Sequence, residues 1–198
     1  WGAVDDDTRR DMLDRLASAA RRLSGLVEDL MTATLSERGA LHLVPRPMTA
    51  AAFVDAAVQG SRMALAPPEV LDVEGHAVLR VDPIYGPRML ANLLDNAVKY
   101  GRRPVEARLA QRDGHVDIVV RDHGDGVPAD FEARLFQPFR QAEGHERRRR
   151  GGVGLGLHTV AQLAELSGGT IRYRPADGGG AEFHLRLPAA HPESEVVG

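Results

Sequence analysis

The stretch that most constrains this chain is residues 90–100, LANLLDNAVKY, which predict one helix with two chemically different faces. The apolar residues recur at i, i+3, i+4 and i+7, the spacing of a helix face that packs against a core. They are Leu90, Leu93, Leu94 and Ala97. On another face lie Asn92, Asn96, Lys99 and Tyr100. The pattern predicts an amphipathic helix whose polar face is open to a ligand or to solvent.

The polar face of this helix suits a magnesium nucleotide. The amide oxygens of Asn92 and Asn96 are ligands for a hard cation, and the ammonium group of Lys99 attracts phosphate. An ordinary helix with a solvated surface has the same spacing, so other motifs must decide between the two interpretations. Asp82-Pro83 is a favourable helix start, although Gly86-Pro87 delays the regular part to about Pro87.

A second long helix is predicted near the N-terminus. Residues 5–8, Asp-Asp-Asp-Thr, are a strong helix start, and Gly39 is expected to end the helix. Between them an apolar stripe steps alternately by three and four residues, through Leu13, Leu16, Ala20, Leu23, Val27, Leu30 and Thr34. Met12, Leu26 and Ala33 widen it. This heptad predicts a helical bundle with partners from another chain or from sequence upstream of Trp1; the alternative is a helix folded back on its own domain.

The middle of the chain reads as alternating short elements. Pro45 and Pro47 indicate a linker or edge strand and a boundary near Pro45. Thr49 is expected to cap a helix that buries Phe53, Ala56, Ala57 and Met63 before Pro67-Pro68. Residues 70–81 predict a hairpin around Gly75, and residues 105–110 and 116–120 predict an antiparallel pair joined by Asp113-Gly114. A last hairpin is expected from residues 171–174 and 181–187, with a disordered tail from Pro188.

Two glycine motifs follow. Residues 122–128, DHGDGVP, place an acid before two spaced glycines, so that the backbone can approach a flat ligand while Asp122 accepts from an amine; an ordinary turn is the alternative. Residues 131–139 follow, with Leu135, Phe136 and Phe139 expected as buried anchors. Residues 151–157, GGVGLGL, open a helix running to about Leu166, whose free N–H groups can cradle phosphates. This motif is neither a P-loop nor a dinucleotide fingerprint.

Between the two motifs, residues 140–150 are polar and end in four arginines. Such a segment is expected to lack order without an anion, or else to be a solvated loop. The overall charge of −3 gives no general attraction to nucleic acid, and the absence of cysteine excludes disulfides and thiolate metal sites. We find no apolar run long enough for a membrane span and no signal peptide.

The Asn helix, D-x-G-x-G, the Phe-x-Pro-Phe segment and G-x-G-L-G-L stand in one order, and together they resemble the ATP-binding domain of sensor histidine kinases, within the Bergerat-fold ATPases. The resemblance covers residues 49–188. It implies a two-layer α/β sandwich with a mixed sheet, preceded by one long bundle-type helix. The run AARRLSGLVEDL also resembles the second helix of a dimerisation and histidine-phosphotransfer domain. The implied division is 1–44 partial dimerisation domain, 45–190 catalytic domain and 191–198 tail.

The resemblance also implies a role for each matching residue, with ATP and Mg²⁺ as cofactors. Asn96 should coordinate magnesium, Asn92 should support that site, Lys99 should meet the phosphates, and Tyr100 should border the nucleotide. Asp122 should bind the exocyclic amine of adenine, with Gly124 and Gly126 leaving room for the ring. The phosphates should be bounded by Gly152, Gly154, Leu155, Gly156 and Leu157. Lid arginines, Arg149 and Arg150 foremost, should neutralise the transferred phosphoryl group. Gly180-Ala181 stands where the family often has Gly-Thr, a departure expected to be structural only.

One position separates kinases from other members of the fold. Chaperone, mismatch-repair and mitochondrial-kinase members have a glutamate base four residues before the magnesium asparagine, and this chain has Asn92 there. An amide takes no proton at neutral pH, whereas a neutral imidazole is already a competent nucleophile. The resemblance therefore implies a histidine kinase over an ATPase or serine-type kinase. A nucleotide-binding module or pseudokinase that signals by binding is the other alternative.

The acceptor histidine of the family, followed by an acid and then a proline, is not found in this chain. The simplest expectation is a fragment cut inside the helical hairpin, with the acceptor upstream of Trp1. The implied partners are that hairpin, a second copy of the full-length protein and a response regulator, with no nucleic acid. The implied location is cytoplasmic, with membrane attachment only through upstream segments.

Overall fold

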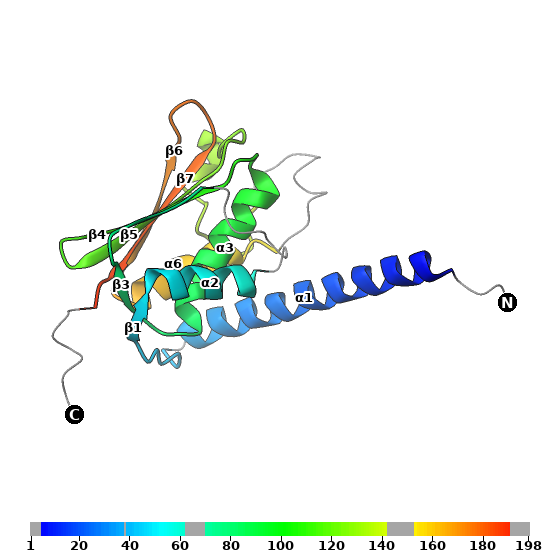
Figure 1. Cartoon of the computed structure of the whole chain (residues 1–198), viewed down its shortest axis with the longest axis horizontal. Coiled ribbons are helices and arrows are strands. Elements are labelled where there is room, and N and C mark those ends of the chain that lie inside the picture. The colour runs from blue at the N-terminus through cyan, green and yellow to red at the C-terminus, as the bar shows by residue number, and fades with distance from the viewer. Residues whose placement is uncertain (1–4, 38, 62–69, 142–152, 191–198) are drawn as a thin grey trace.

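The computed structural model describes residues 5–37, 39–61, 70–141 and 153–190 (Figure 1). In chain order the elements are α1 (Asp6–Glu37), β1 (Arg46–Thr49), α2 (Ala50–Gly60), β2 (Val70–Glu74), β3 (Val78–Val81), α3 (Tyr85–Tyr100), β4 (Glu106–Arg112), β5 (His115–Arg121), α4 (Ala129–Glu132), α6 (Gly156–Leu166), β6 (Thr170–Pro175) and β7 (Ala181–Pro188). No helix in these ranges has the length and apolarity needed to cross a lipid bilayer.

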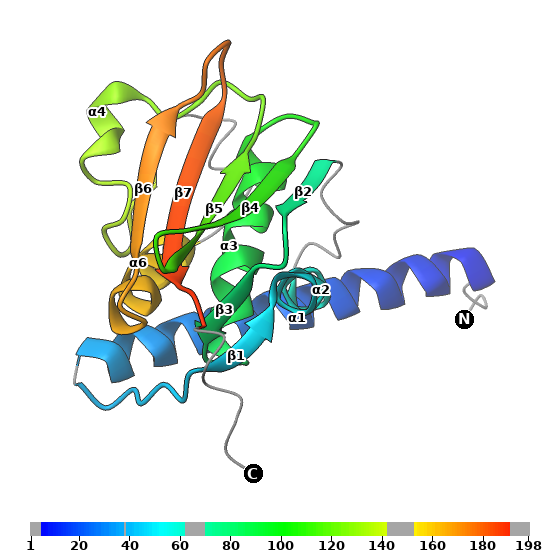
Figure 2. The same ribbon diagram turned by 60° about the vertical axis from the view of Figure 1, so that its left-hand side comes forward.

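The main sheet has five strands in the order β2-β4-β5-β7-β6 (Figure 2). β2 pairs with β4 in parallel, and the other neighbours are antiparallel, so the sheet is mixed. α3 and α6 lie behind one face of this sheet, and the opposite face is open (Figure 2). The expected α/β fold with a mixed sheet is confirmed.

The two faces of the sheet follow from strict alternation along the strands. In β5, Val116, Ile118 and Val120 are buried against the helices, while the residues between them face outward. The turn into β5 has positive φ at both Asp113 and Gly114, as a tight two-residue hairpin requires, so the predicted pair is confirmed. On α3 the entire predicted stripe, Leu90, Leu93, Leu94 and Ala97, is buried in the same core.

Asp82 binds the backbone at the start of α3, although the N-cap residue of the helix is Ile84 and not Asp82 as predicted. Its carboxylate accepts from the N–H groups of Ile84 (2.9 Å) and Tyr85 (3.1 Å), and also from Val44 (2.9 Å). Burial acts to raise the pKa of Asp82, but these three N–H donors and the nearby charge of Arg46 together hold the pKa below the ordinary value. The helix begins at Tyr85, two residues before the expected Pro87.

The predicted hairpin around Gly75 is wrong. β2 lies in the main sheet beside β4, whereas β3 pairs antiparallel with β1 in a separate two-stranded sheet. β3 buries Leu79 and Val81 completely and meets the end of β7 through a bridge from Leu79 to Ala189. The chain leaves β2, passes through β3 and α3, and returns as β4, which is the long crossover that a parallel pair needs.

Several smaller expectations need correction. α2 ends at Gly60, earlier than expected, and it buries Val54 where Ala56 is only half-buried; Met63 lies outside the described residues. Its predicted cap is present, since the Thr49 hydroxyl accepts from Ala52 N–H at 3.2 Å. Phe139 is not an anchor, because 62% of it is exposed. The N–H groups of Ala189 and Ala190 bond to Gly114 and Val78, so the expected tail does not begin at Pro188.

α1 uses two different faces. Near its C-terminal end, Asp29, Thr32 and Ala33 are buried, and the carboxylate of Asp29 binds the guanidinium of Arg88 on α3 at 2.9 Å. Most of the predicted heptad stripe is exposed, by 60% at Leu13 and 64% at Leu23, although Thr34 is half-buried and Ala33, which widens the stripe, is buried. Gly39, with φ of 63°, follows the helix end as expected. The helix thus packs on its own domain at one end, while most of its apolar stripe stays uncovered in the single chain.

Candidate functional site

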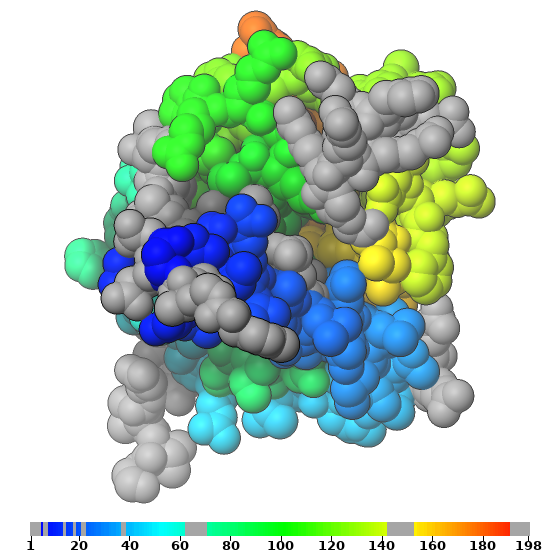
Figure 3. Space-filling view, turned by 90° about the vertical axis from the view of Figure 1, so that its right-hand side faces the viewer, coloured from blue at the N-terminus to red at the C-terminus, as the bar shows by residue number. Residues whose placement is uncertain are grey.

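α3 is the common neighbour of the two glycine motifs. At one end, Gly101 directly after the helix lies against Asp122 of the D-x-G-x-G loop. Further back, the amide of Asn92 donates to the carbonyl oxygen of Gly156, at the start of α6, at 3.4 Å. Figure 3 views the molecule from the side on which α1 projects, with α1 in blue in front and yellow atoms, which include the start of α6, above its paler blue end. The fold therefore brings the three motifs to one helical side of the sheet.

Asp122 is the buried acid of the site, with only 5% of the residue exposed. Its N–H donates to Ala181 O at 3.0 Å, and its Oδ1 accepts from Gly124 N–H at 2.8 Å. Burial raises the pKa of Asp122, against the opposing effect of hydrogen bonds from Gly124 and Ala181 and of nearby His123. The second carboxylate oxygen can accept from a ligand amine.

Glycines surround Asp122 at distances that no side chain would permit. A Cβ at Gly101 would overlap the Asp122 side chain and the Ala97 carbonyl oxygen, and one at Gly124 would lie 2.7 Å from Gly101 Cα. At Gly180, which has φ of 98°, a Cβ would overlap the Asp122 carbonyl oxygen. Gly101 was missed, although a glycine directly after the polar helix was the available signal.

Gly126 shapes the far side of the same loop. Its φ is 71°, a left-handed conformation that favours glycine, and a Cβ there would lie 3.0 Å from Gly180 O. The next N–H, of Val127, donates to the hydroxyl of Tyr173 at 3.3 Å, and Tyr173 packs on Phe183. The loop is thus held from beneath by the β6–β7 hairpin.

The other end of the site is the start of α6. The φ of Gly154 is 76°, and a Cβ there would lie 2.8 Å from the backbone nitrogen of Arg140. Gly156 faces Asn92, with space for a Cβ at 3.8 Å. Among the described residues, the N-cap Leu155 makes no side-chain cap hydrogen bond, which leaves the first turn of α6 suited to binding an anion. Leu155 is buried and Leu157 packs on the core, so both anchor this turn.

The polar face of α3 carries the remaining described candidates. Asn92 is 5% exposed, whereas Asn96 and Lys99 are half-buried. The Lys99 ammonium lies 4.8 Å from the centroid of the Tyr100 ring, and Tyr100 is 37% exposed. Arg149, Arg150 and Gly152 lie outside the described residues. The described face therefore presents two amides, an ammonium and a phenol.

A magnesium site of protein ligands alone is not found within the described ranges, where no three His, Cys, Asp or Glu residues are grouped to hold a metal. Asn96 offers one hard amide oxygen beside a lysine and an uncapped helix start. This donor set fits an ion whose other ligands are phosphate oxygens and water. It does not fit a metal held by the protein alone.

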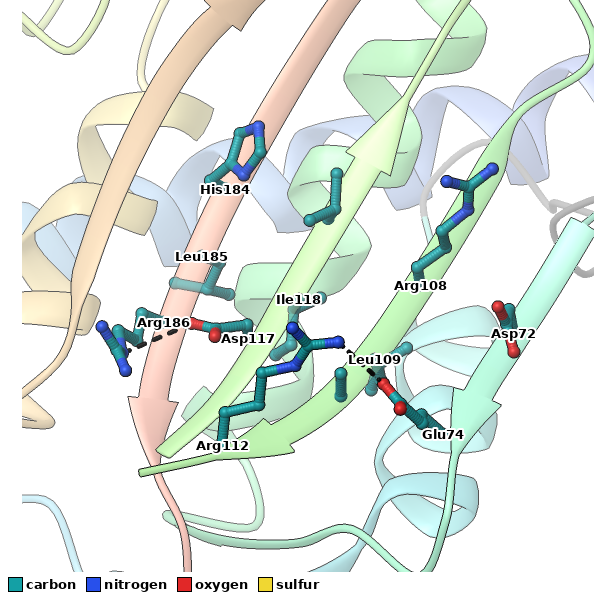
Figure 4. Close-up of a pocket in the computed structure, with 12 residues that line it drawn as sticks. Asp72, Glu74, Arg108, Leu109, Arg112, Asp117, Ile118, His184, Leu185 and Arg186 are labelled. Atoms are coloured by element: carbon teal, nitrogen blue, oxygen red, sulfur yellow. Dashed lines mark hydrogen bonds and ion pairs between the residues drawn. The ribbon is translucent and has the colours of Figure 1, made fainter. Parts of the chain in front are cut away.

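A depression of about 470 Å³ lies on the opposite, open face of the sheet (Figure 4). Its charged lining is Asp72, Glu74, Arg108, Arg112, Asp117 and Arg186. Arg112 pairs with Glu74 at 3.1 Å and Arg186 with Asp117 at 3.3 Å, across neighbouring strands. Such exposed pairs contribute little stability each. None of the predicted site residues lines this depression, so it is separate from the candidate site.

Comparison with known proteins gives one consistent family. Residues 83–191 match the family described as histidine kinase-, DNA gyrase B-, and HSP90-like ATPase. The signal transduction histidine-protein kinase AfsQ2 of Streptomyces coelicolor is 38% identical over 173 residues, which are 87% of this chain and 32% of that protein. The probable sensor histidine kinase HK of Mycobacterium tuberculosis is 33% identical over 96% of this chain and 53% of its own length. The chain thus spans about a third to a half of these curated relatives.

Solved structures that match this chain are also histidine kinases. The mycobacterial sensor histidine kinase MprB matches with a TM-score of 0.59 and 27% identity, over 74% of this chain and 98% of that one. Full-length ShkA in complex with AMPPNP matches with a TM-score of 0.71 and 25% identity, over 98% of this chain and 42% of that one. The Acinetobacter baumannii histidine kinase AdeS, at 23% identity and a TM-score of 0.69, shows the same fold over 96% of this chain and 88% of that one.

Proposed function

The chain belongs to the histidine kinase-, DNA gyrase B- and HSP90-like ATPase family, as an ATP-binding domain of the sensor histidine kinase type, and we propose that it phosphorylates histidine. In this proposal the γ-phosphoryl group of Mg-ATP passes to a histidine on a separate helix hairpin. From there it is relayed to a response regulator. The relatives named as histidine kinases and the AMPPNP bound by ShkA support the choice of reaction and nucleotide.

The proposal of a histidine acceptor rests on Asn92. It is a buried amide that donates to the carbonyl oxygen of Gly156, at the position where hydrolytic members of the fold have a glutamate base. An amide has no basicity to deprotonate water or a serine hydroxyl, while a neutral imidazole needs no base to attack phosphorus. The site is therefore suited to a nucleophile that is already active at neutral pH.

At the phosphate end, we assign Asn96 as the magnesium ligand, with Asn92 in support and Lys99 on the phosphates. If magnesium binds there, Asn96 would supply an amide oxygen to it, and the ion would supply positive charge that neutralises the phosphates. The uncapped start of α6, at Gly154, Leu155, Gly156 and Leu157, bounds the phosphates with backbone N–H groups. Gly152, Arg149 and Arg150 remain predictions of the sequence, because they lie outside the described residues.

At the base end, Asp122 accepts from the adenine amine through the oxygen that Gly124 does not use. Gly124 and Gly126 keep side chains away from the ring, and Tyr100 borders the nucleotide. Guanine presents an oxygen where adenine has its amine, so GTP should bind poorly.

The acceptor is proposed to lie outside this chain's own histidines. His123 donates to Glu106 at 2.8 Å, and His158 lies 3.1 Å from the Phe136 carbonyl oxygen, so both are held by their surroundings. His42, His76, His115 and His184 lie in loops or strands, and His145 and His191 lie outside the described residues. We propose that residues 1–44 form part of a dimerisation domain and residues 45–190 the catalytic domain. The exposed stripe of α1 fits a bundle with that hairpin in a homodimer.

The test uses γ-labelled ATP and magnesium with the purified chain, with and without an added dimerisation hairpin that carries an acceptor histidine. We expect acid-labile label on the hairpin and none on the chain alone. Acid-labile label on the chain alone would contradict the proposed separate acceptor. Tight ATP binding with no label on either partner would instead indicate a module that signals by binding.

A further inference from the structure

A side-chain pair that the family motif does not include ties the start of the D-x-G-x-G loop to the sheet. His123 Nε2 donates to Glu106 Oε1 at 2.8 Å, between the loop and the first residue of β4. The other ties at the start of the loop use the backbone: Asp122 N–H to Ala181 O and His123 N–H to Arg102 O, both at 3.0 Å. His123 is therefore held at its main chain by the end of α3 and at its ring by the sheet.

Strand alternation explains why this pair forms opposite Asp122. Arg121, the last residue of β5, is the cross-strand neighbour of Glu106. Val120 and Asp122 are buried on the helical side, so His123 continues the alternation towards the open side, where Glu106 lies. One peptide unit thus joins a carboxylate on the nucleotide side to an imidazole anchored on the other side.

The two side chains of the pair differ in exposure, and Glu106 is the more buried of the two. The Glu106 side chain is 13% exposed and that of His123 is 34% exposed. The hydrogen bond from His123 is the main cause that lowers the pKa of Glu106, aided by Arg108, whose guanidinium donates to the other oxygen at 3.0 Å. An ionised carboxylate only accepts, so Nε2 of His123 carries the proton in this bond.

We propose that Glu106 and His123 are positioning residues for base recognition, which hold the Asp122 carboxylate turned towards adenine. This rests on the proposed function, in which Asp122 reads the base. Without this side-chain pair, the start of the loop keeps only its backbone hydrogen bonds and the bond from Gly124 N–H, so the direction of the Asp122 carboxylate is fixed less narrowly. Binding then loses both affinity for ATP and discrimination against GTP, because a displaced acceptor no longer meets the amine in line.

The experiment measures ATP and GTP affinity for the parent chain, His123→Ala, Glu106→Ala and the double variant. Each single change should weaken ATP binding about tenfold and narrow the ratio of ATP to GTP affinity, and the double variant should lose no more than either single one. His123→Gln, which keeps an N–H donor near the Nε2 position, should restore most of the ATP selectivity. A purely structural role would lower thermal stability without changing base selectivity.

His184→Ala is the matched control. His184 also bonds to a glutamate on the open face, Glu182 at 3.2 Å, but it lies within β7 and away from the loop. It should bind both nucleotides as the parent does.

Asp122→Ala distinguishes a failure of the positioning role from a failure of the proposed function. If it loses base selectivity while His123→Ala and Glu106→Ala keep parental values, the positioning role is overturned and the proposed function stands. If the folded parent does not bind ATP, the proposed function itself fails.

Discussion

The two ends of the candidate site are built in different ways. At the base end, Asp122 is enclosed by the backbone of Gly101, Gly124 and Gly180, and a Cβ at any of them would collide with a neighbour. At the phosphate end, Asn96 and Lys99 project from one face of α3 and are half-buried. In the proposed function, base recognition therefore depends on how closely main chains approach, and phosphate recognition depends on two half-buried side chains of one helix face.

From this difference, we expect the largest loss of stability and of ATP binding for a substitution at Gly101. Its φ is −88°, so alanine meets no backbone penalty there, but its Cβ would overlap the Asp122 side chain and the Ala97 carbonyl oxygen. We expect Gly101→Ala to destabilise the fold by about 3 kcal/mol, measured by chemical denaturation, and to abolish selective ATP binding. Gly60→Ala is the control, since nothing lies within 4 Å of a Cβ there. Equal stability of the two variants would mean that the base end is not closely packed.

The phosphate end should respond in affinity and leave stability unchanged. Asn96→Ala and Lys99→Ala should each weaken Mg-ATP binding by about 1.5–3 kcal/mol, or roughly ten- to a hundredfold, because a charge-assisted contact is lost. Their unfolding free energies should stay within about 0.5 kcal/mol of the parent. Titration with a fluorescent ATP analogue measures the affinity.

Removal of magnesium should distinguish the Asn96 variant from the Lys99 variant. With a chelator present, Asn96→Ala should bind ATP no more weakly than the parent, while Lys99→Ala should still show its loss. Glu165→Ala, an exposed position near the end of α6, is the control for both variants. An Asn96→Ala protein with parental affinity in magnesium would remove the basis of the metal assignment.

The smallest effect concerns the titration of Asp122. Burial raises its pKa above the ordinary 3.8, so the folded chain holds this proton more tightly than the unfolded chain does. The unfolding free energy therefore falls as pH rises through the interval between 3.8 and the raised folded pKa. Asp122→Asn keeps an acceptor for Gly124 N–H and removes the titration, so it should flatten stability against pH in that interval.

The titration of Asp122 should change ATP affinity in the opposite direction, so that affinity rises with pH while stability falls. Only the ionised carboxylate is free to accept from adenine without competition from its own proton, so ATP binding should strengthen as pH rises through that interval. The Asp122→Asn variant should lack this dependence. A parental curve in the variant would place the titrating group elsewhere.

Local signals predicted much of the fold correctly. The stripe on α3, the cap at Thr49 and the tight turn at Asp113-Gly114 all appear as expected. Each depends on residues within about one helical turn or one hairpin, where spacing and backbone preference act directly. Neither the partner of a strand nor the exposure of a side chain is local in this sense. The misplaced hairpin around Gly75 and the exposed Phe139 are errors of that kind.

In the candidate site, too, some features follow from residues close in sequence and others from the packing of separate elements. The sequence alone was sufficient to propose Asn92, Asn96, Lys99 and Asp122, because each lies in a motif whose chemistry is read from neighbours along the chain. Only the tertiary structure decided that Gly101 and Gly180 enclose Asp122, and that Glu106 binds His123 across 17 positions of sequence. It also decided which face of α1 packs through Asp29 against Arg88. The physical reason is that such contacts depend on how separate elements pack, and no periodicity within one element encodes the identity of its neighbour.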